Sequence, residues 1–308
     1  MTIANWVLVL ILAVLSALVV RRLERRPEEG WRRFFNYPGS GIGLGALIFV
    51  IALAVLAPLI APYRPSLQLD IVALQNRPPS WAHILGTDLF ARDLWSRIVY
   101  GARISLGVGA LAALVTVVIG AAAGAAAGYF GAATESVLMR LVDIGLAIPR
   151  IFMVLIVIAV GRQLGATGLA LLLGLTGWFA TARLVRADVL VLREESFIEA
   201  ARALGARPWR VIARHLLPNA AATLIVSAAL AVANMMLLEA GLSFLGVGVQ
   251  PPTPSWGNMI ADARDQLTAA PWSSIFPGLA LTVVVMALHA VADGARDALD
   301  PRQGQAAG

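Results

Sequence analysis

Long apolar runs constrain this chain more than any other feature of its sequence. They lie at residues 3–20, 44–60, 104–129, 137–160, 168–184, 220–245 and 275–291. A helix of about 20 apolar residues crosses a bilayer, because lipid offers backbone N–H and C=O groups no partner outside the helix itself. Of 308 residues, 59% are hydrophobic and 14% are charged. The sequence therefore predicts an all-α integral membrane protein with several spans.

The first apolar run, residues 3–20, has two interpretations, a retained spanning helix or a secretory signal. No positive side chain precedes the run, whereas Arg21, Arg22, Arg25 and Arg26 follow it, and no small-residue cleavage site is evident. This order of charges is opposite to that of a signal peptide. We therefore expect a retained transmembrane helix.

The distribution of charge predicts membrane topology. A net charge of +6 would raise the question of nucleic acid binding in a soluble protein. Here every basic residue is Arg, and most lie between the apolar runs, so we expect no nucleic acid partner. The positive-inside rule places in the cytoplasm residues 21–33, the loop containing Arg140, the region from Arg183 to Arg214, and the C-terminal segment with Arg296 and Arg302. The outer side then holds two long segments, residues 61–103 and 246–272, and a short one with Arg162. The N-terminus also lies outside.

The sequence contains no pattern that predicts catalysis. There is no Cys, only three His, no phosphate-binding GxxxxGK[ST] motif, and no nucleophile with a plausible base. We therefore expect neither a catalytic site nor a metal or cofactor, and any ATP chemistry must occur in another subunit.

Residues 196–219 form a polar, patterned segment between two apolar runs. Ser196 and Glu199 predict a capping box, with a first helix from Phe197 to Leu204. Gly205 can end this helix in the left-handed conformation. Pro208 suits the first turn of a second helix, and Pro218 is expected to limit its far end.

The second helix of this segment is predicted to be amphipathic and cationic. One face is expected to carry Trp209, Ile212 and Leu216. Another face is expected to carry Arg207, Arg210 and Arg214. Such a helix pair could simply lie at the lipid headgroup surface, where Trp and Arg are both well solvated.

The identity of several residues favours another interpretation. Glu199-Ala200-Ala201, Gly205 and His215-Leu216-Leu217-Pro218 resemble the EAA loop of ABC importer permeases. The resemblance implies that residues 196–218, the coupling loop, dock into a groove on an ATP-binding subunit and transmit its closure. The residues implied in coupling are Glu199, Ala200, Ala201, Gly205, His215, Leu217 and Pro218.

Three further segments are similar to the dipeptide, oligopeptide and nickel permeases: residues 85–106, 238–260 and 293–302. One departure is Ala91, where those proteins usually carry Gly. The family's C-type subunit begins near Trp31, so residues 1–29 form an addition, which either anchors the N-terminus or touches a partner permease.

This resemblance implies a fold and a division of the chain. We expect the six-helix core of a type I ABC importer plus one extra N-terminal transmembrane helix. The expected divisions are residues 1–30 for the extra helix and basic linker, 31–102 for the first core helix and outer segment, 103–295 for the permease domain, and 296–308 for a cytoplasmic tail.

The function implied is that of a multi-pass permease subunit in the bacterial inner membrane, within an ATP-driven importer of di- or oligopeptides. Its implied partners are ATP-binding subunits, a second homologous permease, an extracytoplasmic solute-binding protein and the lipid bilayer. Nickel or glutathione-like solutes are alternatives. A proton-coupled secondary transporter is another, but the coupling loop and the lack of paired repeats with broken helices disfavour it.

Ionisable groups and small residues inside spans leave two interpretations open. Asp143, Pro149 and Glu239 are candidates for a gate or solute path, and structural hydrogen bonding, subunit contact or packing is the alternative. A series of small residues between positions 107 and 128 favours close helix packing, with a role in lining the path as the alternative.

Overall fold

The protein is described by a computed structural model that covers residues 3–26, 28–160 and 164–299. Arg162, Arg302 and most of the predicted tail 296–308 lie outside the described residues. The described chain is built of helices, with one isolated antiparallel bridge between Thr87 and Asp93. The helices before the coupling loop are α1 Ile3–Glu24, α2 Glu29–Asn36, α3 Ser40–Val55, α4 Ala57–Ile60, α5 Ile71–Leu74, α6 Leu94–Phe130, α7 Ala132–Ala147, α8 Arg150–Val160, α9 Ala166–Leu175 and α10 Trp178–Leu192. Those after it are α14 Ala221–Phe244, α15 Trp256–Asp262, the 3₁₀ turn η2 Arg264–Gln266 and α16 Trp272–Leu299.

The helices account for the predicted spans. Helices α1, α6, α14 and α16 are each long and apolar enough to cross a bilayer. Three bent pairs meet the same criteria together: α2 with α3 at 95°, α7 with α8 at 86°, and α9 with α10 at 43°. Counting each pair as one span gives up to 7 within the described residues, in agreement with the predicted all-α membrane protein.

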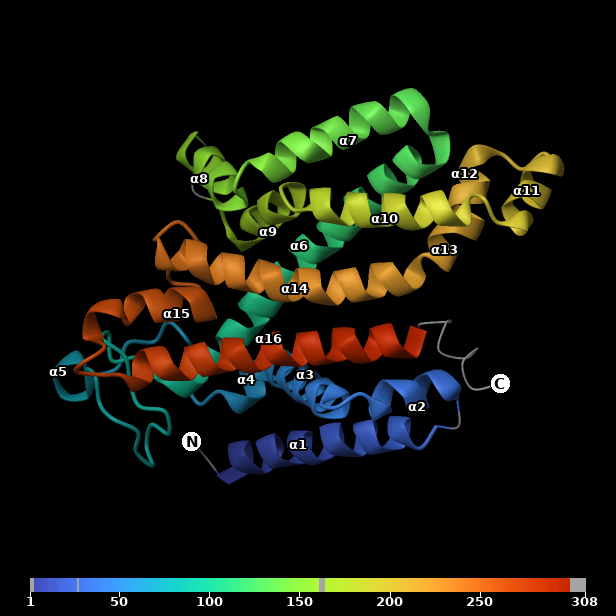
Figure 1. Cartoon of the computed structure of the whole chain (residues 1–308). Coiled ribbons are helices and arrows are strands. Elements are labelled where there is room, and N and C mark those ends of the chain that lie inside the picture. The colour runs from blue at the N-terminus through green and yellow to red at the C-terminus, as the bar shows by residue number, and fades with distance from the viewer. Residues whose placement is uncertain (1–2, 27, 161–163, 300–308) are drawn as a thin grey trace.

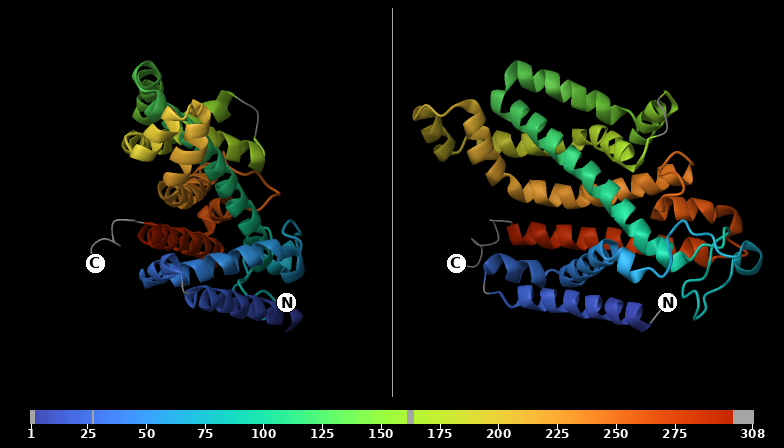
Figure 2. Two further views of the ribbon diagram at one scale, coloured as in Figure 1. Left: turned by 90° about the vertical axis from the view of Figure 1, so that its right-hand side faces the viewer. Right: turned by 180° about the vertical axis from the view of Figure 1, so that it is seen from behind.

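Helix α6 crosses the bundle diagonally and connects its two halves (Figure 1). It packs against α9, α10 and α14 on one side, while α14 packs on α16, α16 on α3, and α3 on α1. The segments predicted to be cytoplasmic, including α2 and α11 to α13, lie at one end of the bundle in both Figure 1 and Figure 2. The segments predicted to be outside, with α5 and α15, lie at the other end.

The glycines of α6 allow close approach to α10. A Cβ on Gly124 would overlap the carbonyl oxygen of Ala182 and lie 2.9 Å from Cβ of Val185. Gly120 and Gly128, one turn to either side, meet α10 equally closely. Spacing of four residues places all three on one helix face, so the two backbones pack together. Gly107 differs, because a Cβ there would meet nothing within 4 Å.

Helix α6 begins earlier than the apolar run predicts. It starts at Leu94 instead of residue 104, with Asp93 as its N-cap accepting a hydrogen bond from the Ser96 N–H. Arg97, which the hydropathy pattern assigned to an outer loop, is a helical residue with only 3% of its surface exposed. The prediction failed because apolarity marks the part of a helix within lipid, whereas this helix continues into the outer protein layer.

Helix α1 lies at the edge of the bundle. Its Val9 and Leu12 are buried against the end of α3 and α4, and Asn5 donates a hydrogen bond of 2.8 Å to the Ile60 carbonyl. The rest of α1 presents large apolar side chains outward, including Leu10 at 62% and Val14 at 57% exposure. A helix that is apolar on its outward face is suited to contact with lipid.

Candidate functional site

The coupling loop folds as two short helical segments with a bend. They are α11 Ser196–Ala203, followed by α12 Pro208–Val211, the π-helical turn η1 Ile212–Leu216 and α13 Leu217–Asn219. Gly205 has φ of +78°, as the sequence predicted. The Ala206 N–H donates to the Ala201 carbonyl at 3.0 Å and the Gly205 N–H to the Arg202 carbonyl at 2.9 Å. This pair of bonds is a Schellman motif, which ends α11 and fixes the bend.

The predicted capping box at the start of α11 is wrong. Glu195, with φ of −73° and ψ of 142°, is the N-cap, and its side chain makes no capping bond. Ser196 is already the first helical residue. The Glu195 carbonyl instead accepts the Ile198 N–H at 2.9 Å, so the helix begins one residue earlier than the Ser-x-x-Glu pattern indicates.

The second helical segment also differs from its prediction. Pro218 does not end the segment, since it lies within α13 and the chain continues almost directly into α14. Because Pro218 has no N–H and its ring would clash with the carbonyl four residues earlier, the preceding turn widens, and the Leu217 N–H bonds to Ile212. The wider turn changes which side chains share a face. Trp209 is therefore 62% exposed beside Arg210, not buried with Leu216.

The base of the coupling loop is fixed to the ends of α6 and α10. Ile198 of α11, Val211 of α12 and Leu216 of η1 are fully buried. They pack in one cluster with Ala125 of α6 and with Val185 and Val189 of α10. Arg193 at the end of α10 donates a hydrogen bond of 3.0 Å to the Gly128 carbonyl of α6. Movement of the loop must therefore move these two helices with it.

The opposite surface of α11 is exposed and small. Glu199, Ala200 and Gly205 are exposed, as is Leu204, while Ala201 is half-buried. Two alanines leave this face thin, and Glu199 provides a charge at its tip. The arrangement is a projecting element on a rigid base, which suits insertion into a groove of another protein (Figure 1).

The remaining predicted coupling residues lie behind this surface. His215 and Leu217 are half-buried and Pro218 is exposed. The His215 carbonyl accepts a hydrogen bond of 2.6 Å from the Asn219 side chain. The structure thus separates the predicted set into an exposed tip and a group that shapes the loop.

Two side chains important for the base were not singled out from the sequence, Ile198 and Val211. Their signal was present, since each is a branched apolar residue in an otherwise polar segment. In the described residues, no group of three or more His, Asp or Glu side chains could hold a metal ion.

Pro149 lies at the break between α7 and α8. Ile148 before it is extended, with φ of −94° and ψ of 124°, as expected for a residue that precedes proline. Arg150 follows, and its guanidinium donates to the Leu173 carbonyl at the end of α9 and lies 2.8 Å from the sulfur of Met235 on α14. The break between α7 and α8 is therefore attached to the break between α9 and α10.

Asp143 lies on α7 in a charged groove shared with α10. It pairs with Arg183 at 2.5 Å, and Glu135 pairs with Arg186. The Asp143 and Arg183 side chains remain more than half exposed, at 64% and 53%. The groove has a volume of about 410 Å³. Ion pairs on the surface of spanning helices are poorly accommodated by lipid, so this face is suited to water or to another protein.

Glu239 is buried inside α14, with 1% of its surface exposed. One carboxylate oxygen accepts hydrogen bonds from the hydroxyls of Ser243 at 2.7 Å and Ser255 at 2.8 Å. These hydroxyls in turn accept the backbone N–H groups of Val249 and Asn258. The network attaches the segment around Val249 and the start of α15 to α14.

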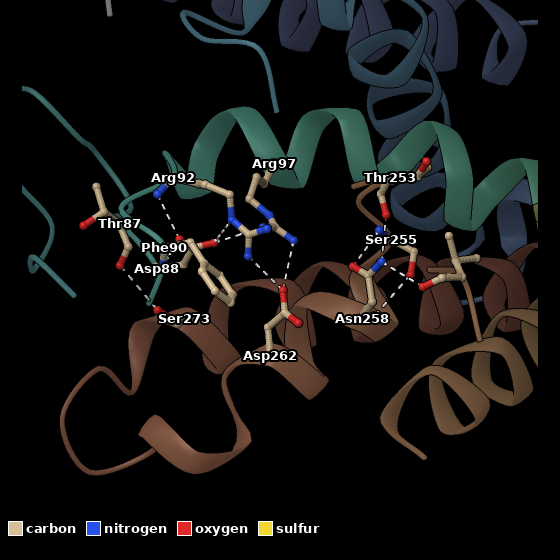
Figure 3. Close-up of polar contacts among 11 residues, drawn as sticks. Thr87, Asp88, Phe90, Arg92, Arg97, Thr253, Ser255, Asn258, Asp262 and Ser273 are labelled. Carbon is tan, nitrogen blue, oxygen red and sulfur yellow. Dashed lines mark hydrogen bonds and ion pairs between the residues drawn. The ribbon is translucent and has the colours of Figure 1, made fainter. Parts of the chain in front are cut away.

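A second polar network, the outer ion-pair cluster, comprises Asp88, Arg92, Arg97 and Asp262 (Figure 3). Arg92 donates to Asp88 at 2.6 Å and to Asp262 at 2.9 Å, and Arg97 donates to the same two carboxylates at 3.0 and 3.3 Å. Burial raises the pKa of Asp262, and the neighbouring Arg92 opposes that rise. The cluster joins the start of α6 to α15, so it closes the outer end of the bundle.

Ala91 occupies the turn that leads into this cluster. It is fully buried and has φ of +53°, a conformation that favours Gly. The turn therefore keeps the geometry expected of a Gly at this position although the residue is Ala.

The sequence of this chain is similar to those of known transport proteins. Residues 116–305 match the family described as binding-protein-dependent transport system inner membrane component. Residues 28–79 match the N-terminal TM domain of oligopeptide transport permease C. Together the two matches include α2 to α5, the last part of α6 and all the described helices from α7 to α16.

Two curated relatives cover most of the chain. The dipeptide transport system permease protein DppC of Alkalihalophilus pseudofirmus is 40% identical over 282 residues, covering 88% of this chain and 90% of its own length. The glutathione transport system permease protein GsiD of Pectobacterium atrosepticum is 37% identical over 299 residues, covering 97% and 98%.

A solved structure shares the fold. The MetNI methionine ABC transporter, in inward facing conformations, superposes with a TM-score of 0.51 and 19% identity. The match covers 65% of this chain and 96% of the other. It confirms the predicted fold of an ABC importer core.

Proposed function

The chain belongs to the family of binding-protein-dependent transport system inner membrane components, and we propose that it forms, with a second permease subunit, the membrane path of an ATP-driven peptide importer. In this proposal the ATP is bound and hydrolysed by separate subunits, and an extracytoplasmic protein delivers the solute. The site of action is the bacterial inner membrane.

One observation carries the coupling part of the proposal. The exposed tip of α11, with Glu199 and Ala200, projects from a base whose Ile198, Val211 and Leu216 are fully buried. A force applied at the tip is transmitted through this packed base, because a close-packed interior deforms little. The tip is thus suited to receive the closure of an ATP-binding subunit and to pass it to α6 and α10.

The charged groove of α7 and α10 supports the position of the path. Asp143 and Arg183 would face lipid if this surface were at the periphery, at a penalty of several kcal/mol. We assign the surface to the water-filled path and its boundary with the second permease. A groove with carboxylates and guanidiniums together can solvate a peptide, which carries both an amino and a carboxylate end.

The gate in this proposal lies at Pro149. At this break, backbone groups lack their hydrogen-bond partners within the helix. Arg150 attaches the break to the end of α9. Rotation of α10 relative to α9 would move both breaks together. Glu239 has a structural role in this account, since its carboxylate is enclosed by two hydroxyl donors.

Peptides are the solute class we propose because the dipeptide permease relative is aligned over most of both chains. The glutathione permease relative favours one specific alternative, a glutathione-like tripeptide. Both solutes present amino and carboxylate groups, so the same charged groove suits either.

The test is uptake by the full complex reconstituted in vesicles, with ATP hydrolysis and entry of a labelled dipeptide measured in parallel. We expect Glu199→Lys to leave the protein inserted and the ATPase active but to lower dipeptide uptake per ATP at least tenfold. The matched control is Glu28→Lys, an equal charge reversal at an exposed carboxylate outside the coupling loop and its base. Normal uptake by Glu199→Lys, or an equal loss in both variants, would contradict the proposal.

A further inference from the structure

A groove between α1 and α3 remains unexplained by transport. It has a volume of about 630 Å³ and lies on the side of the bundle opposite the charged groove. Its walls are made of small or apolar side chains, among them Ala13 and Ala17 on α1 and Gly45 and Phe49 on α3. We propose that this groove binds an anionic phospholipid, with one acyl chain between the helices and the headgroup phosphate at Arg21.

The position of Arg21 supports this assignment. Ala13, Ala17 and Arg21 are spaced four residues apart, so they lie on one face of α1, and all three line the groove. Arg21 is in the last turn of the helix, at the cytoplasmic end. An acyl chain that lies along Ala13 and Ala17 therefore brings its headgroup to the guanidinium.

The surrounding charge favours an anionic headgroup. Residues 21–33 contain six Arg and three Glu, directly after a spanning helix. Among the described residues, no carboxylate lies within ion-pair distance of Arg21, Arg22 or Arg25. Glu24 also lines the rim, so the phosphate is expected on the Arg21 side of the opening. Basic clusters that follow a spanning helix attract anionic lipids.

The junction of α2 and α3 borders the end of the groove at which Arg21 lies. The chain bends by 95° between α2 and α3, and Phe35 and Tyr37 line the groove at this bend. Phe34 on the inner face of α2 is buried against α16, near Gly294. Aromatic side chains and Arg21 therefore line the same end of the groove, where the headgroup would lie.

The test is retention of phosphatidylglycerol by the full chain, titrated in detergent and measured by mass spectrometry of the intact protein, with phosphatidylcholine as the zwitterionic comparison. We expect preferential binding of phosphatidylglycerol and about fivefold weaker binding by Arg21→Gln. Arg22→Gln removes the same charge next to the groove but outside its lining, so its affinity should change less than twofold. Ala17→Phe should fill the groove and abolish retention, whereas Val14→Phe on the outward face should not.

Three results would overturn the proposal. The first is equal binding of the two lipids, and the second is an equal effect of Arg21→Gln and Arg22→Gln, which would indicate only general surface charge. The third is loss of the lipid when the complete complex assembles, which would assign the groove to the partner permease. Circular dichroism of each variant checks that it is folded.

Discussion

The close approach of α6 and α10 makes a quantitative prediction for Gly124→Ala. The new Cβ would overlap the Ala182 carbonyl and lie 2.9 Å from Val185 Cβ and 3.0 Å from the Arg186 nitrogen. Because two of these three contacts are backbone atoms of α10, which cannot rotate aside as a flexible side chain can, α10 must move away from α6. Overpacking of this kind destabilises by about 1–3 kcal/mol. Replacing a helical Gly with Ala gains up to about 1 kcal/mol, which partly hides this loss.

Gly107→Ala is the matched control, because it is the same substitution on the same helix with nothing within 4 Å of the new Cβ. The propensity gain is common to both variants and cancels in their comparison. We expect Gly124→Ala to have a free energy of unfolding about 1–3 kcal/mol lower than Gly107→Ala, measured by denaturant titration in detergent. Gly124→Ala should also lower uptake per ATP, since α10 holds the coupling loop. Equal stability of the two variants would refute the packing argument.

Three further predictions concern the loop and the outer end. Because Gly205 has φ of +78° and no neighbour within 4 Å, Gly205→Val should lose coupling through backbone strain of about 1–2 kcal/mol, while Gly205→Asn, which tolerates this conformation, should keep it. Leu216→Ala should destabilise the protein by about 2–5 kcal/mol, as judged by denaturant titration, and reduce uptake more than ATP hydrolysis. Burial raises the pKa of Asp262 above the unfolded value of about 3.9, so its contribution makes the unfolding free energy fall as pH rises from about 4. Asp262→Asn should remove that fall, and an unchanged pH profile would contradict it.

The membrane spans could be predicted from sequence because the bilayer imposes a length and a composition on every helix that crosses it. The two breaks at Pro149 and between α9 and α10 occur within such runs. Pro149 was a visible signal for the first break. The second break, with a bend of 43°, lies at Gly177, but a single Gly is tolerated inside many helices, so this bend depends on the packing around Arg150 and was not predictable.

Local sequence signals predicted part of the structure of the coupling loop and missed another part. Gly205 and Pro208 act through their own backbone preferences, so the bend and the second helix start were predictable. The burial of Leu216 and the exposure of Trp209 were not predictable. They depend on the wider turn before Pro218 and on contact with α6 and α10. Tertiary packing decided which apolar side chain is buried.

The outer ion-pair cluster could not be assembled from the sequence. Arg92 and Asp262 are 170 residues apart, and no local pattern indicates that they meet. Resemblance to known permeases marked the segment around Asp88 but not the reason for its charges. The structure supplies that reason, since each Arg is shared by two carboxylates.

The most direct test of the coupling mechanism uses the absence of Cys from this chain, which makes a single introduced thiol unambiguous. Ala200→Cys, at the exposed tip of α11, should form a short-range cross-link with the ATP-binding subunit in the assembled complex. The yield should change when ATP binds, while Ser136→Cys on α7 should give none. A complex that is fully active yet shows no cross-link from position 200 in any nucleotide state would contradict the account.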